Sequence, residues 1–199
     1  NKINLPDKTI LITFDDGYSS NYKIAYPILE KYNMKAVIFM IGSSTGKSTY
    51  KDTDNPIYPH FNKEEAAVME ESGIIEVASH TFDMHQSSLY EKIPRESVLR
   101  LEGEGEEEYI RLLTEDYNKS KEQLKEITGR VNNALAYPLG KWDTLSQAIL
   151  NSLGVEITMS TKEGTNTLIK GMPQSLYCLK RYNMHAKVTA IEMLGKIKE

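Results

Sequence analysis

The sequence contains one cysteine, Cys178, among 199 residues. A single cysteine excludes an internal disulfide and any metal site built from several cysteines, so a bound metal would need histidine and carboxylate ligands. The longest apolar run, residues 36–41, is far shorter than the roughly 20 residues that cross a bilayer, which predicts no membrane span. Positive charge is not in excess, because the sequence contains 24 Lys and Arg and 28 Asp and Glu. This balance argues against nucleic acid as a partner.

A starting methionine is also missing, since the first residue is Asn1. We therefore expect an export or anchor segment upstream of this chain. Hydrophobic residues make up 40% of the sequence, enough for one packed core, and no linker divides the chain. These features predict a single domain over residues 1–199, and a monomer is the simplest expectation.

Runs of Val, Ile, Leu, Phe and Tyr alternate along the chain with segments of helical periodicity. Several runs are almost continuously apolar, which is typical of parallel strands covered on both faces. The alternation predicts an α/β fold, either a β/α barrel or a doubly wound sheet. We expect strands at residues 9–14, 35–41, 74–79, 134–137, 155–160 and 176–182, helices at 20–33, 63–72, 104–128, 144–153 and 187–197, and long loops at 42–62 and 85–103.

Candidate chemical groups follow two of the expected strands, where reactive residues cluster in β/α folds. Asp15 and Asp16 end the first strand, and their adjacent carboxylates would repel each other unless a cation or shared proton relieved them. His80 and His85 follow the third strand on a loop, from which both rings can turn toward one point. With Asp16 they form a donor set for zinc or a similar ion. Taken singly, these pairs are also compatible with an Asp-Gly turn and with surface histidines.

Two further strand ends carry candidate groups. The turn at residues 137–140 (Tyr-Pro-Leu-Gly) leaves the backbone N–H of Leu139 free to help form an oxyanion hole. The last expected strand leads to His185, which could protonate a leaving group. Asp83, between the two histidines, either holds an imidazole or faces solvent.

Two segments resemble the first two signature motifs of the polysaccharide deacetylases, carbohydrate esterase family four. They are Thr-Phe-Asp-Asp-Gly at residues 13–17 and Ser-His-Thr-Phe-Asp-Met-His at residues 79–85. The resemblance spans residues 9 to about 185 and implies a distorted β/α barrel with fewer than eight strands. Ala-Tyr-Pro-Leu-Gly at residues 136–140 is similar to the Ala-Tyr-Pro-Tyr-Gly of the poly-N-acetylglucosamine deacetylase branch.

Roles for individual residues are implied by this resemblance. Asp15 would be the general base, and Asp16, His80 and His85 would bind a divalent metal, with Zn²⁺ expected and Co²⁺ or Ni²⁺ as alternatives. The metal would lower the pKa of a bound water, which attacks the acetamide carbonyl. The amide of Leu139 would then stabilise the oxyanion, and a histidine near the end of the barrel, for which His185 is the candidate, would protonate the departing amine.

The third family motif departs from its usual form, because Leu135 stands where an arginine is common. Arg95, Arg100 and Arg181 are candidates to supply the missing positive charge, and the family's Asp-x-x-Asp-Trp motif is not apparent. Trp142 could line the sugar site, since aromatic rings pack well against sugar faces, or it could be an ordinary wedge under a loop. The expected substrate-binding residues are Tyr137, Pro138, Trp142 and Arg181.

The resemblance implies a metal-dependent hydrolase that removes N-acetyl groups from a polysaccharide containing N-acetylglucosamine, such as peptidoglycan, poly-N-acetylglucosamine or a chitin-like polymer. Such substrates imply an extracellular or envelope-attached location. Two alternatives stay open, an esterase that removes O-acetyl groups from polysaccharide and a non-catalytic module that binds glycan. Retention of Asp15 beside the three metal-ligand candidates argues against the non-catalytic module.

Overall fold

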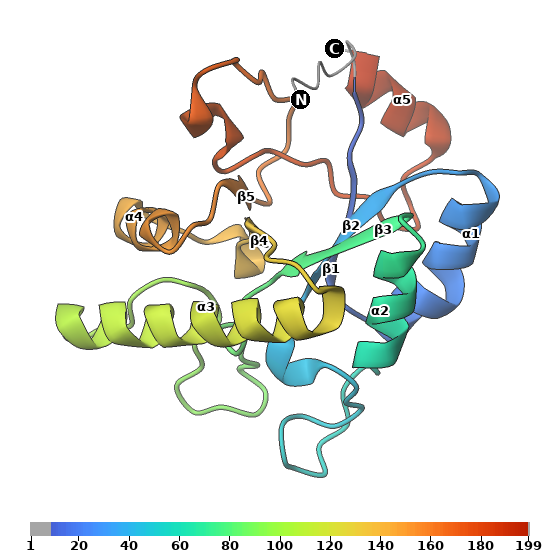
Figure 1. Ribbon diagram of the computed structural model, residues 1–199. Coiled ribbons are helices and arrows are strands. Elements are labelled where there is room, and N and C mark those ends of the chain that lie inside the picture. Colours follow the sequence, from blue (N-terminus) through green and yellow to red (C-terminus); the bar gives the residue numbers. More distant parts are fainter. Residues whose placement is uncertain (1–8, 199) are drawn as a thin grey trace.

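The computed structural model describes residues 9–198 and contains one parallel sheet whose five strands follow the order of the chain (Figure 1). Each connection is therefore a crossover, and the sheet curls into a partial barrel, which confirms the expected distorted barrel with fewer than eight strands. Asn1, on which the expectation of an upstream segment rests, lies outside the described residues. The strands are β1 (Ile12–Asp16), β2 (Ala36–Met40), β3 (Ile75–Ser79), β4 (Ala134–Ala136) and β5 (Ile157–Met159).

Helices cover the outer face of the curled sheet. Asn62 and Glu65 form a capping box that starts α2, and Gly129 ends α3 in the left-handed conformation that glycine adopts readily. The helices are α1 (Tyr26–Lys31), α2 (Lys63–Glu71), α3 (Glu106–Thr128), α4 (Thr144–Ser152) and α5 (Ala190–Lys198), with short 3-10 turns at η2 (Gly42–Ser44), η3 (Pro138–Gly140) and η4 (Pro173–Leu176). Among residues 9–198 no helix is long and apolar enough to cross a membrane.

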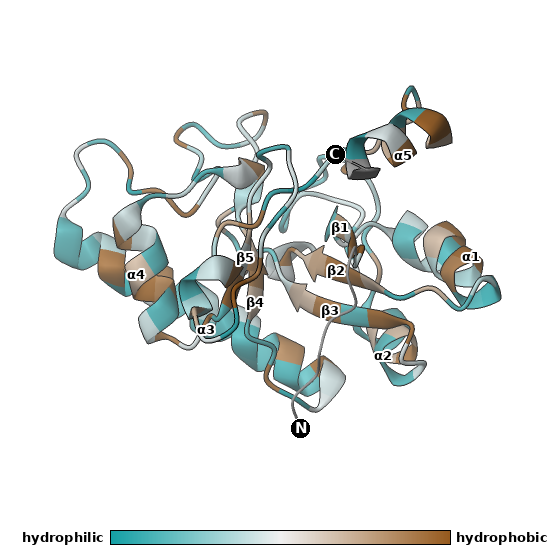
Figure 2. Ribbon diagram, turned by 90° about the horizontal axis from the view of Figure 1, so that it is seen from above, coloured by the Kyte–Doolittle hydropathy of each residue, from teal (hydrophilic) through white to brown (hydrophobic). Residues whose placement is uncertain are grey.

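Successive residues of each strand face opposite sides of the sheet, and this alternation decides what lies inside the barrel. Ile38 and Met40 pack outward among the buried residues of α1 and α2. Phe39 instead belongs to an interior cluster with Ala78, Ala136 and Met159. β2 therefore has apolar residues on both faces, and Figure 2 colours its ribbon brown.

The long helix α3 spans the outer face and packs against α2, β3 and α4. Its buried side chains recur at helical spacing, which is why the sequence pattern predicted this helix nearly to the residue. Most are apolar or aromatic, but two are polar, Asp116 and Ser120, one turn apart on the same face. The buried residues of α3 are Tyr109, Leu113, Asp116, Tyr117, Ser120 and Leu124.

The prediction of a sixth strand at residues 176–182 is wrong. This segment begins in the turn η4, and only Leu179 forms a bridge, to Met159 of β5. Cys178 has a φ of 55°, far from the extended backbone of a strand, so pairing cannot continue along the segment. The backbone N–H of Leu179 donates to Thr158 of β5, and its carbonyl accepts from Ser160 directly after β5; the chain then continues to Arg181, which contacts β1.

The first strand and two helices also differ in their bounds from the sequence expectation, since β1 covers Ile12–Asp16 rather than residues 9–14. The helix expected at 20–33 is divided into a five-residue π-helix, Asn21–Ala25, and the shorter α1. The last helix starts at Ala190 rather than at residue 187, because Thr189 and Glu192 cap it with reciprocal hydrogen bonds.

The loops at 42–62 and 85–103 are long as expected and contact each other. The rings of Tyr50 and Tyr90 lie 4.9 Å apart, and Lys51 Nζ lies 2.7 Å from a carboxylate oxygen of Glu91. Lys51 also pairs with Asp83 at 3.0 Å, so the two loops are joined beside the turn that links the two candidate histidines.

Candidate active site

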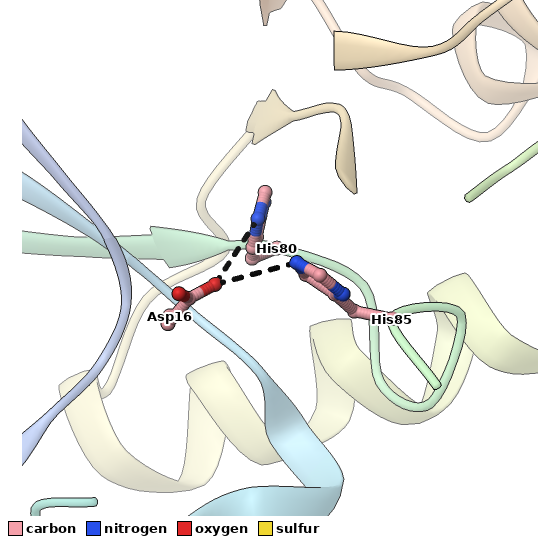
Figure 3. Close-up of side chains that lie close together, drawn as sticks. All are labelled: Asp16, His80 and His85. Carbon is pink, nitrogen blue, oxygen red and sulfur yellow. Dashed lines mark ion pairs between the residues drawn. The ribbon is translucent and has the colours of Figure 1, made fainter. Parts of the chain in front are cut away.

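The four candidate residues lie at the carboxyl ends of two strands, and Figure 3 shows Asp16, His80 and His85 of this set. Asp15 and Asp16 are the last residues of β1, whereas His80 follows β3 directly and His85 lies five residues further along the turn. β1 and β3 both pair in parallel with β2, so their ends lie at one edge of the sheet. The structure thus brings together the two motifs that the sequence separates by more than 60 residues.

Asp16, His80 and His85 form a compact set of possible metal ligands. The Nε2 atoms of both histidines lie 3.5 Å from Oδ1 of Asp16, and the three donor atoms are all within 4.8 Å of one another. That Oδ1 atom is buried and has no hydrogen-bond partner among residues 9–198. A buried carboxylate oxygen that faces two imidazole nitrogens suits a divalent cation, because the cation would satisfy all three donors at once.

The orientation of His80 also suits a metal ligand. Its Nδ1 atom donates a hydrogen bond of 2.7 Å to the carbonyl of Ala136 at the end of β4, which leaves Nε2 unprotonated and directed at Asp16. Burial lowers the pKa of His80, although the nearby carboxylates of Asp15 and Asp16 act in the opposite direction. The ring is therefore neutral near pH 7, the form that binds metal.

Asp15 is held by Arg181 rather than by the candidate ligands. Two contacts of 2.7 Å join the guanidinium to both oxygens of the Asp15 carboxylate, and the same guanidinium donates to Thr13. Asp15 is in register with Phe39, which faces the barrel interior, so Asp15 and Thr13 face the interior as well. Burial acts to raise the pKa of Asp15, but the hydrogen bonds and charge of Arg181, with His80 and His85, hold it below its usual value.

The other two arginine candidates lie elsewhere. Arg95 forms an ion pair with Glu104, and Arg100 forms one with Glu106 at the start of α3. Of the three arginines that the sequence offered in place of the missing motif residue, Arg181 is the one that contacts Asp15.

A cavity of about 660 Å³ opens beside Asp16 and His85. This volume is in the usual range for ligand pockets, and the walls are mostly apolar and aromatic. Tyr58 is 80% exposed and packs edge-on against Tyr18, with 5.9 Å between ring centroids. Backbone hydrogen bonds from Ser19 to Pro59 and from Phe61 to Gly17 anchor that wall beside the end of β1. The aromatic and histidine side chains of the lining are Tyr18, Tyr50, Tyr58, His60, His85 and Tyr90.

Only one of the remaining site candidates reaches this cavity. Leu139 lines it, and its φ of 54° places it at the sharpest point of the turn η3. Tyr137 and Pro138 are buried, and the hydroxyl of Tyr137 donates a hydrogen bond to Gln147, so neither side chain presents a surface to a ligand. Trp142 is 40% exposed and stacks on Tyr137 outside the cavity lining.

His185 is exposed and lies away from the cavity lining. Its Nδ1 atom accepts a hydrogen bond from the backbone of Lys187. The carboxylate of Asp83 is bound by Ser43, Lys51 and Gln86 rather than by an imidazole, and its side chain is 33% exposed.

Several residues around the site escaped the sequence reasoning. Tyr58 lies in a loop without periodicity, so no pattern distinguished it. Tyr18 follows the Asp-Asp-Gly turn and could have been found by its position next to that motif. Asp116 could have been found as well, since it lies three residues after Leu113 and so falls on the apolar face of its helix.

Comparisons with known proteins bear on the family and the fold of this chain. A family model described as polysaccharide deacetylase matches residues 2–158. A poly-beta-1,6-N-acetyl-D-glucosamine N-deacetylase of Staphylococcus aureus is 28% identical over 162 residues, which make up 81% of this chain and 51% of that protein. The chain spans about half the length of the curated relatives it matches.

Solved structures are similar over nearly the whole chain. The structure of IcaB from Ammonifex degensii is 25% identical with a TM-score of 0.72, over 99% of this chain and 76% of that one. A de-N-acetylase from Aggregatibacter actinomycetemcomitans has a TM-score of 0.78 at 22% identity, over 97% of this chain and 76% of that one. The second likeness concerns the fold alone.

Proposed function

Because the chain belongs to the polysaccharide deacetylase family, we propose that it is a metal-dependent hydrolase that removes N-acetyl groups from a polysaccharide containing N-acetylglucosamine. The observation that carries this proposal is the cluster of Asp16, His80 and His85 beside a cavity that Asp16 and His85 line, with Asp15 next to Asp16 at the end of β1. Two imidazoles and a carboxylate that can bind a metal ion, with a second carboxylate as a base, are a set of groups that can activate water for amide hydrolysis.

The metal would be held by Asp16, His80 and His85. The unpartnered Oδ1 of Asp16 and the two Nε2 atoms that face it support this assignment, and nitrogen and oxygen donors suit Zn²⁺, with Co²⁺ or Ni²⁺ as alternatives. When bound, such an ion acts as a Lewis acid and lowers the pKa of water toward neutrality.

Asp15 would act as the general base. The two hydrogen bonds from Arg181 orient its carboxylate, and the lowered pKa keeps that carboxylate ionised at neutral pH, ready to accept a proton from water. The backbone N–H of Leu139, which lies at the cavity, is our candidate donor to the oxyanion. An acid role for His185 stays a prediction, since the ring is exposed and lies outside the cavity lining.

We take poly-N-acetylglucosamine as the first polymer to test. The staphylococcal relative is named for the β-1,6-linked form of this polymer, and the aromatic walls of the cavity suit the apolar faces of sugar rings. Peptidoglycan and chitin-like polymers contain the same sugar and stay candidates. A substrate of this kind lies outside the cytoplasm, which supports a secreted or envelope-attached location for the enzyme.

The decisive test is release of acetate by metal-free protein, with and without added zinc or cobalt. The substrates are a β-1,6-linked N-acetylglucosamine pentamer, penta-N-acetylchitopentaose and acetylated xylan. We expect metal-dependent acetate together with a free amine from a glucosamine oligomer. Activity on xylan alone would instead identify an O-acetyl esterase. Acetate release that does not depend on added metal would refute the proposed metal centre.

An Asp15→Asn variant separates an enzyme from a glycan-binding module. The variant should lose turnover while it keeps most of its zinc affinity, because Asp15 pairs with Arg181 and is not among the three candidate ligands. Equal acetate release by the variant and the wild type would rule out Asp15 as the base.

A further inference from the structure

The turn that carries both candidate histidine ligands is held by side-chain oxygens. Thr81, with a φ of 70°, begins it, and its amide bonds to Oγ of Ser79. The amide of Met84 bonds to Oγ1 of Thr81. The two amides between them, those of Phe82 and Asp83, both donate to the carboxylate of Asp116.

Asp116 is a residue of α3, more than 30 positions further along the chain. Its Oδ1 atom lies 2.9 Å from the amide nitrogen of Phe82, and its Oδ2 atom lies 2.6 Å from that of Asp83. One carboxylate therefore binds two consecutive amides, one with each oxygen. Asparagine could not bind one amide with each of two oxygens, because its side chain has a single acceptor oxygen.

The position of Asp116 is unfavourable for a charge. The residue is 9% exposed, and burial raises the pKa of its carboxyl to about 6 even though the two amides stabilise the ionised form. Among the described residues it forms no ion pair. An apolar residue on this face of α3 would avoid the desolvation penalty, so a buried carboxylate here needs an explanation beyond helix packing.

The same helix also holds the residue that precedes His80. Ser120, one turn after Asp116, shares a hydrogen bond of 2.8 Å with Ser79. Helix α3 thus contacts the turn at Ser79, before the first candidate ligand, and at Phe82 and Asp83, between the two.

We propose that Asp116 is a positioning residue of the metal centre, which sets the distance between His80 and His85 by fixing the backbone of the turn between them. This inference rests on the proposed function, in which the two histidines bind metal. Residues that orient metal ligands in this way commonly change metal affinity by 10- to 100-fold when they are replaced.

Asp116→Asn tests the inference, with Glu115→Gln as the matched control. The control changes a neighbouring carboxylate of the same helix, which is about half exposed and pairs with Arg111. We expect zinc affinity, measured by calorimetry in competition with a chelator, to fall at least tenfold in Asp116→Asn and less than twofold in the control. The visible spectrum of the cobalt-loaded protein should also change in Asp116→Asn alone, which general destabilisation of the fold would not produce.

Hydrogen exchange of metal-free wild-type protein gives a second measurement, which does not depend on whether the variant folds. The amides of Phe82 and Asp83 should be protected to a similar degree as those of β3. Rapid exchange at both positions would overturn the inference, as would wild-type zinc affinity in a folded Asp116→Asn variant. If the wild-type protein binds no zinc but the amides of Phe82 and Asp83 exchange slowly, the proposed metal centre is refuted, whereas the hydrogen bonds of Asp116 to the turn are confirmed.

Discussion

The guanidinium of Arg181 binds both carboxylate oxygens of Asp15 at 2.7 Å, although 166 positions separate the two residues. Asp15 lies at the end of β1, the first strand of the sheet, and Arg181 follows the segment that bridges to β5, the last. The pair therefore joins the two open edges of the partial barrel. Arg181 also supplies a positive charge next to Asp15, whereas Leu135 stands at the motif position where an arginine is common.

We expect Arg181→Gln to lower kcat/KM about 10- to 100-fold, because Asp15 would lose both its orientation and the charge that keeps it ionised. Loss of Arg181 raises the pKa of Asp15, so the acidic limb of the pH–rate profile should move to higher pH. Arg100→Gln is the control, since Arg100 pairs with Glu106 at the surface. An unchanged acidic limb in Arg181→Gln would show that Asp15 is not the group that titrates there.

The same pair predicts how stability depends on pH. The pKa of Asp15 is lower in the folded protein than its usual 3.8, so its ionised form stabilises the fold above that pH, and the contribution is lost as pH falls through the folded value. The difference in unfolding free energy between wild type and Arg181→Gln should therefore shrink as the pH falls below 3.8 toward the pKa of Asp15 in the folded protein. Urea unfolding at several pH values measures it, and a difference that grows toward low pH would contradict this assignment.

Zinc should stabilise the protein against unfolding. At a free concentration about 100 times its Kd, a ligand that binds only the folded state adds about 2.7 kcal/mol. His85→Ala should abolish most of this gain, whereas His185→Ala should retain it, because His185 lies outside the cluster of candidate ligands. Thermal unfolding with zinc and with a chelator distinguishes the two variants, and equal zinc responses would argue against His85 as a ligand.

Tyr58 should contribute to the binding of longer substrates. Its exposed ring at the wall of the cavity can pack against a sugar, an interaction worth about 1 kcal/mol, so Tyr58→Ala should raise KM for a pentamer about fivefold and leave kcat nearly unchanged. Tyr32→Ala is the matched control, since Tyr32 is also exposed but lies at the end of α1. Equal KM values for the two variants would exclude a sugar contact at Tyr58.

The core beneath α3 should be sensitive to truncation. Leu113 is fully buried, so Leu113→Ala should lower the free energy of unfolding by about 2–5 kcal/mol. Ile110, on the same helix, is 37% exposed, and Ile110→Ala should cost clearly less. Urea denaturation of both variants makes the comparison, and similar losses would mean that α3 packs differently from the structure described.

The sequence alone determined most of the architecture, because periodicity and capping are local properties. Five of the six expected strands and all the helical segments lie close to where the pattern put them, and Asp15, Asp16, His80 and His85 stood out because strand ends gather at one edge of a parallel sheet. The helix expected at residues 104–128 is observed at Glu106–Thr128, and the prediction succeeded because its apolar residues recur along one face.

Only the tertiary structure decided which distant groups act on these four residues. No spacing in the sequence distinguishes Arg181 from Arg95 or Arg100, because the choice depends on how the chain returns from β5 to β1. Likewise, the pattern marks Asp116 as buried but cannot say that its two oxygens meet the amides of a turn more than 30 residues away. Hydrogen bonds and ion pairs between distant segments depend on the packing of whole elements, and this packing is a property of the folded chain rather than of any local run of residues.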